Sequence, residues 1–152
     1  MAGLLVLLYA QPVPAIVQLT IGHVIDQQTG VLLKLGPTPV ALPPPVDSLL
    51  VRLTSERRGH ASVGRTGTDP WLFPGARPGL PLSAHQMKSR LQRMEIGARP
   101  GRAAALLELA AQMPAAVLHQ LLGVSIRTAP YWSEETGSSW SGYAAEVECL
   151  PG

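Results

Sequence analysis

Basic side chains that could bind phosphate gather in one short stretch of this 152-residue sequence. Between His85 and Arg102 there is a single acid, Glu95, and there are five basic residues, namely Lys88, Arg90, Arg93, Arg99 and Arg102. Lysines and arginines clustered in this way create the positive potential that attracts nucleic-acid phosphates. The stretch therefore predicts a phosphate-facing surface, and a solvated helix face is the other interpretation of such a run.

The remaining charges and the special side chains narrow the classes of function. Residues 133–152 contain four glutamates and no lysine or arginine, so this tail could not face phosphate. Cys149 is the sole cysteine, which excludes an internal disulfide and a cysteine-based metal cluster. The four histidines lack metal-ligand spacing, so we expect no metal and no cofactor. A net charge of +2 names no partner by itself.

The apolar start of the chain does not indicate a membrane protein. Met1 to Ala10 is too short to cross a bilayer, and it lacks the basic start of a signal peptide. With 46% hydrophobic and 14% charged residues, the chain should fold around a core. The simplest prediction is a cytoplasmic protein with no membrane partner and a single domain over residues 1–150.

A second pattern lies between Val117 and Trp132. It reads as a helix, a tight turn at Gly123 and a further helix, with an aromatic residue nine positions after that glycine. Helix-turn-helix proteins use this arrangement to place their second helix in a DNA groove. This pattern makes DNA a candidate partner, and the basic stretch agrees with that partner without establishing it alone.

The elements that must position these residues can be read from periodicity and turn chemistry. Residues 2–9 are apolar and predict a helix that Pro12 and Pro14 end. Loose alternation over 13–24, a turn at 26–30 and apolar runs at 31–35 and 38–42 predict a small antiparallel sheet within residues 17–42. A helix near 46–58 should follow, with Val46, Leu49, Leu50 and Leu53 on one face.

The second half of the chain predicts further helices. Ser83 is a suitable N-cap for a helix to about Met94, with Met87, Leu91 and Met94 buried. A loop containing the arginines should precede helices at 103–113 and 114–122, and a last helix is predicted at 139–148. The expected fold class is α+β, mainly α: a helical bundle with one small antiparallel three-stranded sheet near the N-terminus.

The order of these elements resembles the catalytic domain of the tyrosine recombinase (phage integrase) family. The resemblance extends from about Leu4 to Tyr143. It is carried by the strand meander ending in Val40-Ala41-Leu42-Pro43, the anchor Trp71-Leu72-Phe73-Pro74-Gly75, the segment Pro81-Leu82-Ser83 before a basic helix, and the turn Gln120-Leu121-Leu122-Gly123. It implies a DNA-binding protein of integration and recombination, in a degenerate or N-terminally truncated form that lacks the family's preceding core-binding domain.

The resemblance also implies a set of catalytic positions. The family attacks a phosphodiester with a tyrosine, which is a weak nucleophile unless activated and needs fixed cations to stabilise charge on phosphate. In this chain, Ala10-Gln11-Pro12 stands at the position of the family's first arginine, and the Gly36-Pro37 turn stands at that of its lysine, with Lys34 just upstream. Arg99 and Arg102 correspond to the His-x-x-Arg motif. Val124 takes the place of a histidine, and Trp132 that of the nucleophile. Only Arg102 keeps the expected residue type.

These substitutions predict a recombinase-like protein that binds DNA without catalysing strand exchange. The family that it resembles consists of DNA-cleaving enzymes. Trp132 has no hydroxyl, and Tyr131 could replace it only if its helix turned by about 100°. The expected DNA-binding residues are Lys88, Arg90, Arg93, Arg99 and Arg127. The resemblance further implies that the C-terminal helix joins a second copy or a partner recombinase.

A different class of function stays open. Residues 114–132 could form a true helix-turn-helix reader in a small regulator or adaptor. The strand meander and the Leu-Phe-Pro anchor would have no purpose in a minimal reader, which favours the recombinase-like prediction. The third hypothesis is that the chain is a folded remnant without a biochemical role.

Overall fold

A computed structural model describes residues 1–28, 30–56 and 70–125, and these form an α+β fold in which helices predominate. The helices are α1 (Ala2–Tyr9), α2 (Val13–Val17), α3 (Val46–Ser55), α4 (Ala84–Arg93), α5 (Ala98–Gln112) and α6 (Ala115–Leu122), with a 3-10 turn η1 (Ile21–His23). The strands are β1 (Val24–Gln27), β2 (Gly30–Leu33) and β3 (Val40–Ala41). The predicted fold class is therefore confirmed.

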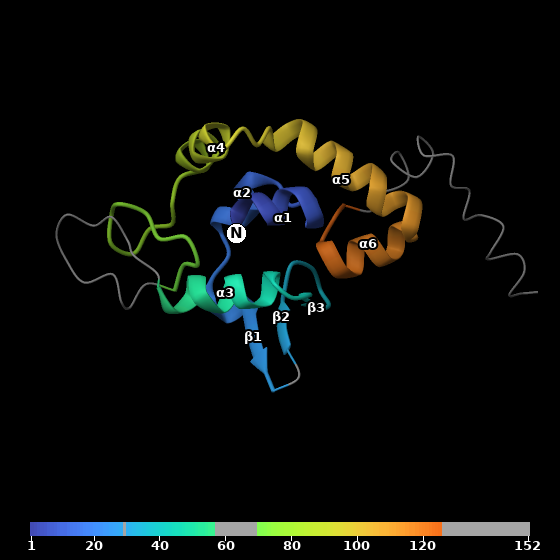
Figure 1. The fold of residues 1–152 in the computed structure, drawn as a ribbon, viewed down its shortest axis with the longest axis horizontal. Helices are drawn as coiled ribbons and strands as arrows, with labels where there is room; N and C mark the ends of the chain where they lie inside the picture. The colour runs from blue at the N-terminus through green and yellow to red at the C-terminus, as the bar shows by residue number, and fades with distance from the viewer. Residues whose placement is uncertain (29, 57–69, 126–152) are drawn as a thin grey trace, which may run out of the picture.

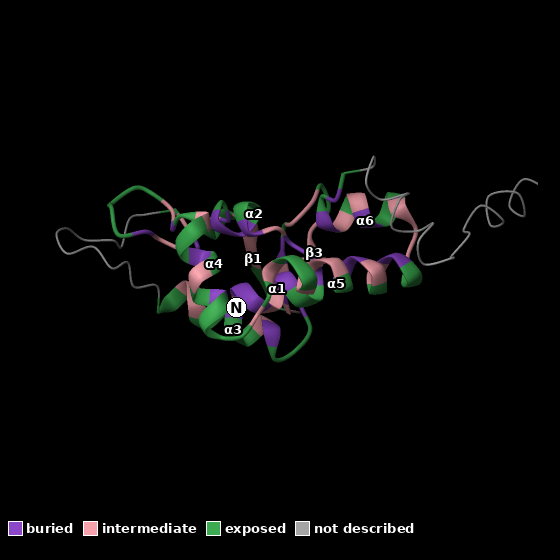
Figure 2. Ribbon diagram, turned by 90° about the horizontal axis from the view of Figure 1, so that it is seen from above, coloured by how far each residue is buried: buried purple, intermediate pink, exposed green. Residues whose placement is uncertain are grey.

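The helices lie on two sides of the N-terminal segment. In Figure 1, α4 and α5 run above α1 and α2, while α3 and the sheet lie below them. Helix α1 packs against α5, and α2 packs against α4. Figure 2 shows buried turns in α1, α2 and α5, where these helices face the interior. Leu5 and Val6 of α1 are fully buried in this core.

The sheet is antiparallel in the order β1-β2-β3, with Val24 opposite Leu33 and Leu33 opposite Val40. It lies within the predicted residues 17–42, but its first strand begins at Val24, so the prediction of a strand from the alternation over residues 13–24 was wrong. Residues 13–17 form helix α2 instead, because their buried side chains follow the helical i, i+3, i+4 spacing. Proline is also tolerated in the first turn of a helix, where the N–H that it lacks has no partner.

Helix α4 has the predicted N-terminus. Ser83 and Gln86 form a capping box, in which the Gln86 backbone N–H donates to the Ser83 hydroxyl. Met87 and Leu91 are buried as predicted, but Met94 is 58% exposed. Glu95 adopts a left-handed φ of 59°, which turns the chain so that Ile96, rather than Met94, packs against Gly3 of α1.

Helix α5 starts at Ala98, five residues before the predicted start, so Arg99 and Arg102 belong to a helix and not to a loop. The Pro100-Gly101 pair suggested a loop. Pro100 occupies the third helical position, where no backbone N–H is needed, and the Gly101 N–H donates to the Gly97 carbonyl at 2.8 Å. The two arginines are therefore held on a regular helix one turn apart.

Helix α6 follows Pro114 and ends at Gly123, as predicted, with a left-handed φ of 65° at that glycine. The loop between β2 and β3 lies against this end. The Thr38 N–H donates to the Gln120 carbonyl at 2.9 Å, and a β-carbon on Gly36 would lie 2.7 Å from the Gly123 nitrogen. The predicted helix at 139–148 lies outside the described residues.

Candidate functional site

Three basic side chains line one cavity of about 350 Å³ between α2, α4 and α5. They are Lys88 of α4 and Arg99 and Arg102 of α5. The other residues around the cavity are apolar or small, namely Pro12, Val13, Pro14, Ala98, Ala103 and Leu106. No carboxylate occurs among the described residues of this lining, so an anion bound there would meet positive charge from these side chains.

Helical geometry explains why these three cations share a cavity. Lys88 directly follows the buried Met87, so it stands at the border between the core-facing and exposed sides of α4. Arg99 and Arg102 are three residues apart and therefore lie on the same side of α5. This side faces the start of α2, whose residues 12–14 form the opposite wall.

Arg102 is the fixed member of the group. Its Nε donates a 2.8 Å hydrogen bond to the Ala10 carbonyl, 92 positions away in the sequence. Ala10 is fully buried and adopts a left-handed φ of 52° at the end of α1. A guanidinium carries five N–H donors, so this bond orients Arg102 and uses only one of them.

A second cavity of about 190 Å³ is lined by the Ala10–Pro12 segment. Its lining comes from four parts of the chain, namely residues 10–12 with Ala15, Leu35, Arg102, and residues 122–125. Arg102 and Pro12 are thus shared by the linings of the two cavities.

Gln11 holds the walls of this second cavity together. It is 4% exposed, and its Nε2 donates to the Tyr9 carbonyl at 3.1 Å and to the Leu122 carbonyl at 2.9 Å. These bonds tie the end of α1 to the end of α6. On the α6 side, a 2.9 Å hydrogen bond joins His119 Nδ1 and the Val124 oxygen. The sequence carried one signal for this role, because Gln11 interrupts a long apolar run.

Three of the positions that the recombinase resemblance assigns to one catalytic set meet at this second cavity, and Arg99 of the same set does not line it. Pro12, Arg102 and Val124 all line it. Leu35, which precedes the Gly36-Pro37 turn, lines it as well. These residues come from four separate segments of the sequence, so their proximity is a property of the fold and not of chain neighbourhood.

The structure does not bring every predicted site residue together. Arg90 and Arg93 are exposed on α4 but line neither cavity, and Arg90 lies about 200° around the helix from Lys88. Lys34 also lines neither cavity. Arg127, Tyr131 and Trp132 lie outside the described residues, as does the second helix of the helix-turn-helix interpretation.

The chemistry of the larger cavity suits binding better than catalysis. In the part of the chain that the structure describes, its lining has no carboxylate, imidazole, hydroxyl or thiol that could act as a general base or an oxygen or sulfur nucleophile. Across residues 1–28, 30–56 and 70–125, no group of histidine, cysteine, aspartate and glutamate could hold a metal ion. Burial raises the pKa of the Tyr9 phenol and lowers that of the Met1 amino group, and neither residue lines either cavity.

The described helices also bear on the question of membranes, since none of them is both long enough and apolar enough to cross a bilayer. Comparisons with family models, with curated proteins and with solved structures found no match for this chain.

Proposed function

We propose that this chain binds the phosphate backbone of double-stranded DNA through Lys88, Arg99 and Arg102, here called the cationic face. The observation that carries the proposal is that these side chains come from two helices to one cavity, and that its described lining residues include no carboxylate. Lysine and arginine contacts to phosphate release counterions, which makes such binding favourable and tolerant of sequence. The face holds phosphates and does not read bases.

The scaffold that we propose for this face is a degenerate tyrosine recombinase catalytic domain. Its support is the meeting of Pro12, Arg102 and Val124 at one cavity, since the resemblance assigns all three positions to a single active site. The close fit of the β2–β3 loop against the end of α6 also favours one integrated domain over an isolated helix-turn-helix unit.

Two finer statements belong to the same proposal. The C-terminal segment at 139–148 would join a second copy or a partner recombinase, as the resemblance implies, and sedimentation of the DNA complex would give its stoichiometry. We also propose a cytoplasmic location, because the apolar start Met1 to Ala10 lacks the basic residues of a signal peptide, and fluorescence imaging of a tagged chain would check it.

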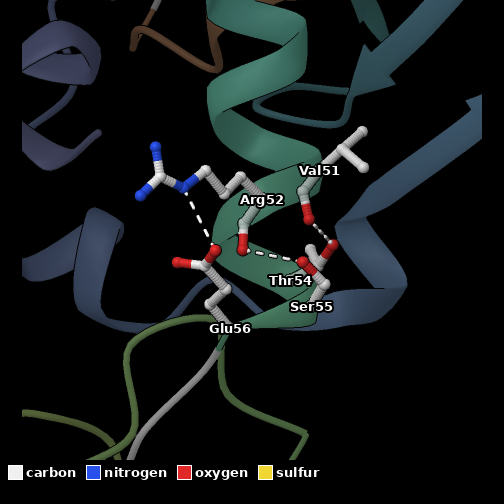
Figure 3. A network of polar contacts seen from close by, with 5 residues as sticks. All are labelled: Val51, Arg52, Thr54, Ser55 and Glu56. Atoms are coloured by element: carbon white, nitrogen blue, oxygen red, sulfur yellow. Dashed lines mark hydrogen bonds and ion pairs between the residues drawn. The ribbon is translucent and has the colours of Figure 1, made fainter.

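The test of DNA binding compares two variants that each remove three positive charges. Lys88→Gln/Arg99→Gln/Arg102→Gln removes the cationic face. Arg52→Gln/Arg90→Gln/Arg93→Gln removes charges outside it, among them Arg52, whose Nε bonds Glu56 on α3 at 3.2 Å (Figure 3). Affinity for a labelled duplex is measured by fluorescence anisotropy at fixed salt.

We expect the first variant to lose affinity by about 100-fold, because three charged contacts of about 1 kcal/mol each give that factor. The second should lose much less. Arg102 also donates a hydrogen bond to Ala10, so its replacement could unfold the chain. In that case the double variant Lys88→Gln/Arg99→Gln replaces the triple variant in the comparison. Equal losses in the two triple variants would show that net charge, and not this face, binds DNA.

We also expect no cleavage of DNA. The assay is a nicked suicide duplex, scored by a covalent protein–DNA band on a denaturing gel. Loss of one charge-stabilising donor typically costs a factor of about 10²–10³, and several are substituted here. Trp132→Tyr alone should therefore remain inactive. A covalent adduct of the parent chain that disappears on Tyr131→Phe would contradict this expectation and identify Tyr131 as the nucleophile.

A further inference from the structure

A DNA backbone bound at the cationic face would leave the interior of the cavity unfilled. A phosphodiester is substituted on two oxygens, so its chain must lie along the mouth and cannot enter a hollow of about 350 Å³. A phosphomonoester has one substituent and can place either its phosphate or its organic body inside. The volume falls at the small end of ligand sites, which span roughly 300–1,000 Å³.

The charges around this cavity also match a monoester better. Lys88, Arg99 and Arg102 supply three positive charges to one hollow. A backbone phosphodiester brings a single negative charge, whereas a phosphomonoester carries about −1.5 to −2 at pH 7. A monoester can therefore neutralise up to two of the three cations. A diester neutralises one and leaves a larger excess of positive charge in the cavity.

The walls supply a place for the organic part of such a ligand. Val13 and Leu106 are buried core residues that reach the cavity, and Ala103 stands beside the two arginines on α5. Pro12 and Pro14 complete an apolar wall on the α2 side. An apolar or aromatic body would cover these carbons while its phosphate stays among the cations, as in small-molecule sites with a few polar groups on an apolar lining.

We propose that the cavity between α2, α4 and α5 binds phosphomonoesters that carry an apolar or aromatic body. The site uses the cations of the proposed function, but its ligand is a small molecule or a chain end, not the duplex backbone. It can therefore exist whether or not duplex DNA binds.

The first test is calorimetric titration with phenyl phosphate, with methyl phenyl phosphate as the matched diester. We expect phenyl phosphate to bind about ten-fold tighter at pH 7.5, because of its second charge and its free oxygens. Its affinity should fall as the pH drops below about 6, where the monoester becomes a monoanion, while that of the diester stays constant. Equal binding of the two esters would overturn the proposal, and so would no binding of phenyl phosphate.

Two variants separate the cavity from its charges. Ala103→Leu keeps every cation, extends a partly exposed helical side chain into the hollow, and should lower the affinity for phenyl phosphate by about ten-fold while leaving inorganic phosphate unaffected. Lys88→Gln/Arg99→Gln should weaken both ligands, and Arg90→Gln/Arg93→Gln neither. Circular dichroism checks that the Ala103→Leu chain is folded. If this folded variant binds phenyl phosphate as tightly as the parent does, the ester binds on the surface and the proposal is contradicted.

Phosphomonoesters can come from free nucleotides or from DNA ends, and two further arms distinguish these sources. Thymidine monophosphate is titrated alone, and a short duplex is compared with and without 5′-phosphates. Preference for the phosphorylated duplex over the free nucleotide indicates a DNA end, and the reverse indicates a free nucleotide. If duplex DNA binds but neither monoester does, the proposed function stands and this inference fails.

Discussion

At the scale of single residues, Arg102 has the central position because it is fixed on one side and available on the other. Its Nε is bound to the Ala10 carbonyl, and its side chain borders both cavities. A donor held in place loses less conformational entropy when it binds an anion than a free surface lysine does. Arg102 should therefore contribute more to phosphate binding than the exposed Lys88 or Arg99.

Tyr9, one residue before Ala10, gives a prediction about pH. It is 9% exposed, and burial raises the pKa of its phenol above the ordinary value of 10.0. The folded chain therefore keeps the Tyr9 proton at a pH where the unfolded chain releases it. This contribution to stability is complete below pH 10 and is lost as the pH rises through the folded-state pKa.

We expect the free energy of unfolding to fall more steeply above pH 10 for the parent than for Tyr9→Phe. The measurement is urea unfolding of both chains between pH 8 and 11, followed by circular dichroism. Comparison of the two chains cancels the titration of the lysines that they share. Parallel curves across this range would contradict the assignment of the raised pKa to Tyr9.

The sequence revealed the basic residues but not their grouping. It marked Lys88, Arg90, Arg93, Arg99 and Arg102 as one surface, whereas helical geometry separates Arg90 and Arg93 from the cationic face. The partner of Arg102 could not be predicted, because a backbone carbonyl 92 positions away has no signature in residue type. Long-range contacts of this kind depend on how α1 packs against α5.

At the scale of elements, helices with local signals were predicted well. Helices α1, α4 and α6 begin and end close to the expected residues, because a capping box, prolines and Gly123 mark their ends. Helix α2 was missed because it has five residues rich in branched side chains, a composition that also favours strands. Its helical state is decided by burial against α4 and not by local preference.

Gly36 tests whether the β2–β3 loop is clamped to α6. A β-carbon there would lie 2.6 Å from the Gln120 oxygen and 2.7 Å from the Gly123 nitrogen, and both are backbone atoms that cannot move aside alone. We expect Gly36→Ala to lower the free energy of unfolding by about 1–3 kcal/mol in urea titration, the usual cost of overpacking.

Gly22→Ala is the matched control for this change. Its β-carbon would meet only the Thr20 hydroxyl, at 3.6 Å, which is an ordinary contact. Stability should stay within about 0.5 kcal/mol of the parent, as for most surface substitutions. If Gly36→Ala is as harmless as Gly22→Ala, the loop does not lie against the end of α6.

At the scale of the whole molecule, residues far apart in the sequence meet around the end of α1. Helix α5 brings Arg102 to Ala10, α6 brings Leu122 to Gln11, and the β2–β3 loop covers the end of α6. Three positions that the recombinase resemblance implies, Pro12, Arg102 and Val124, lie at this junction, whereas Arg99 lines only the larger cavity. We expect phosphate to be bound beside this junction, at the larger cavity, which shares Pro12 and Arg102 with it.

The dependence of DNA affinity on salt tests the central claim most directly. Each phosphate contact contributes about 0.9 to the slope of log K against log salt, so the three cations of the cationic face should contribute roughly 2–3 in total. Anisotropy titrations from low to high salt, on the parent and on Lys88→Gln/Arg99→Gln/Arg102→Gln, give the two slopes. We predict that the variant's slope is shallower by that amount. Equal slopes would contradict the account, because the cationic face would then make no contact with DNA phosphates.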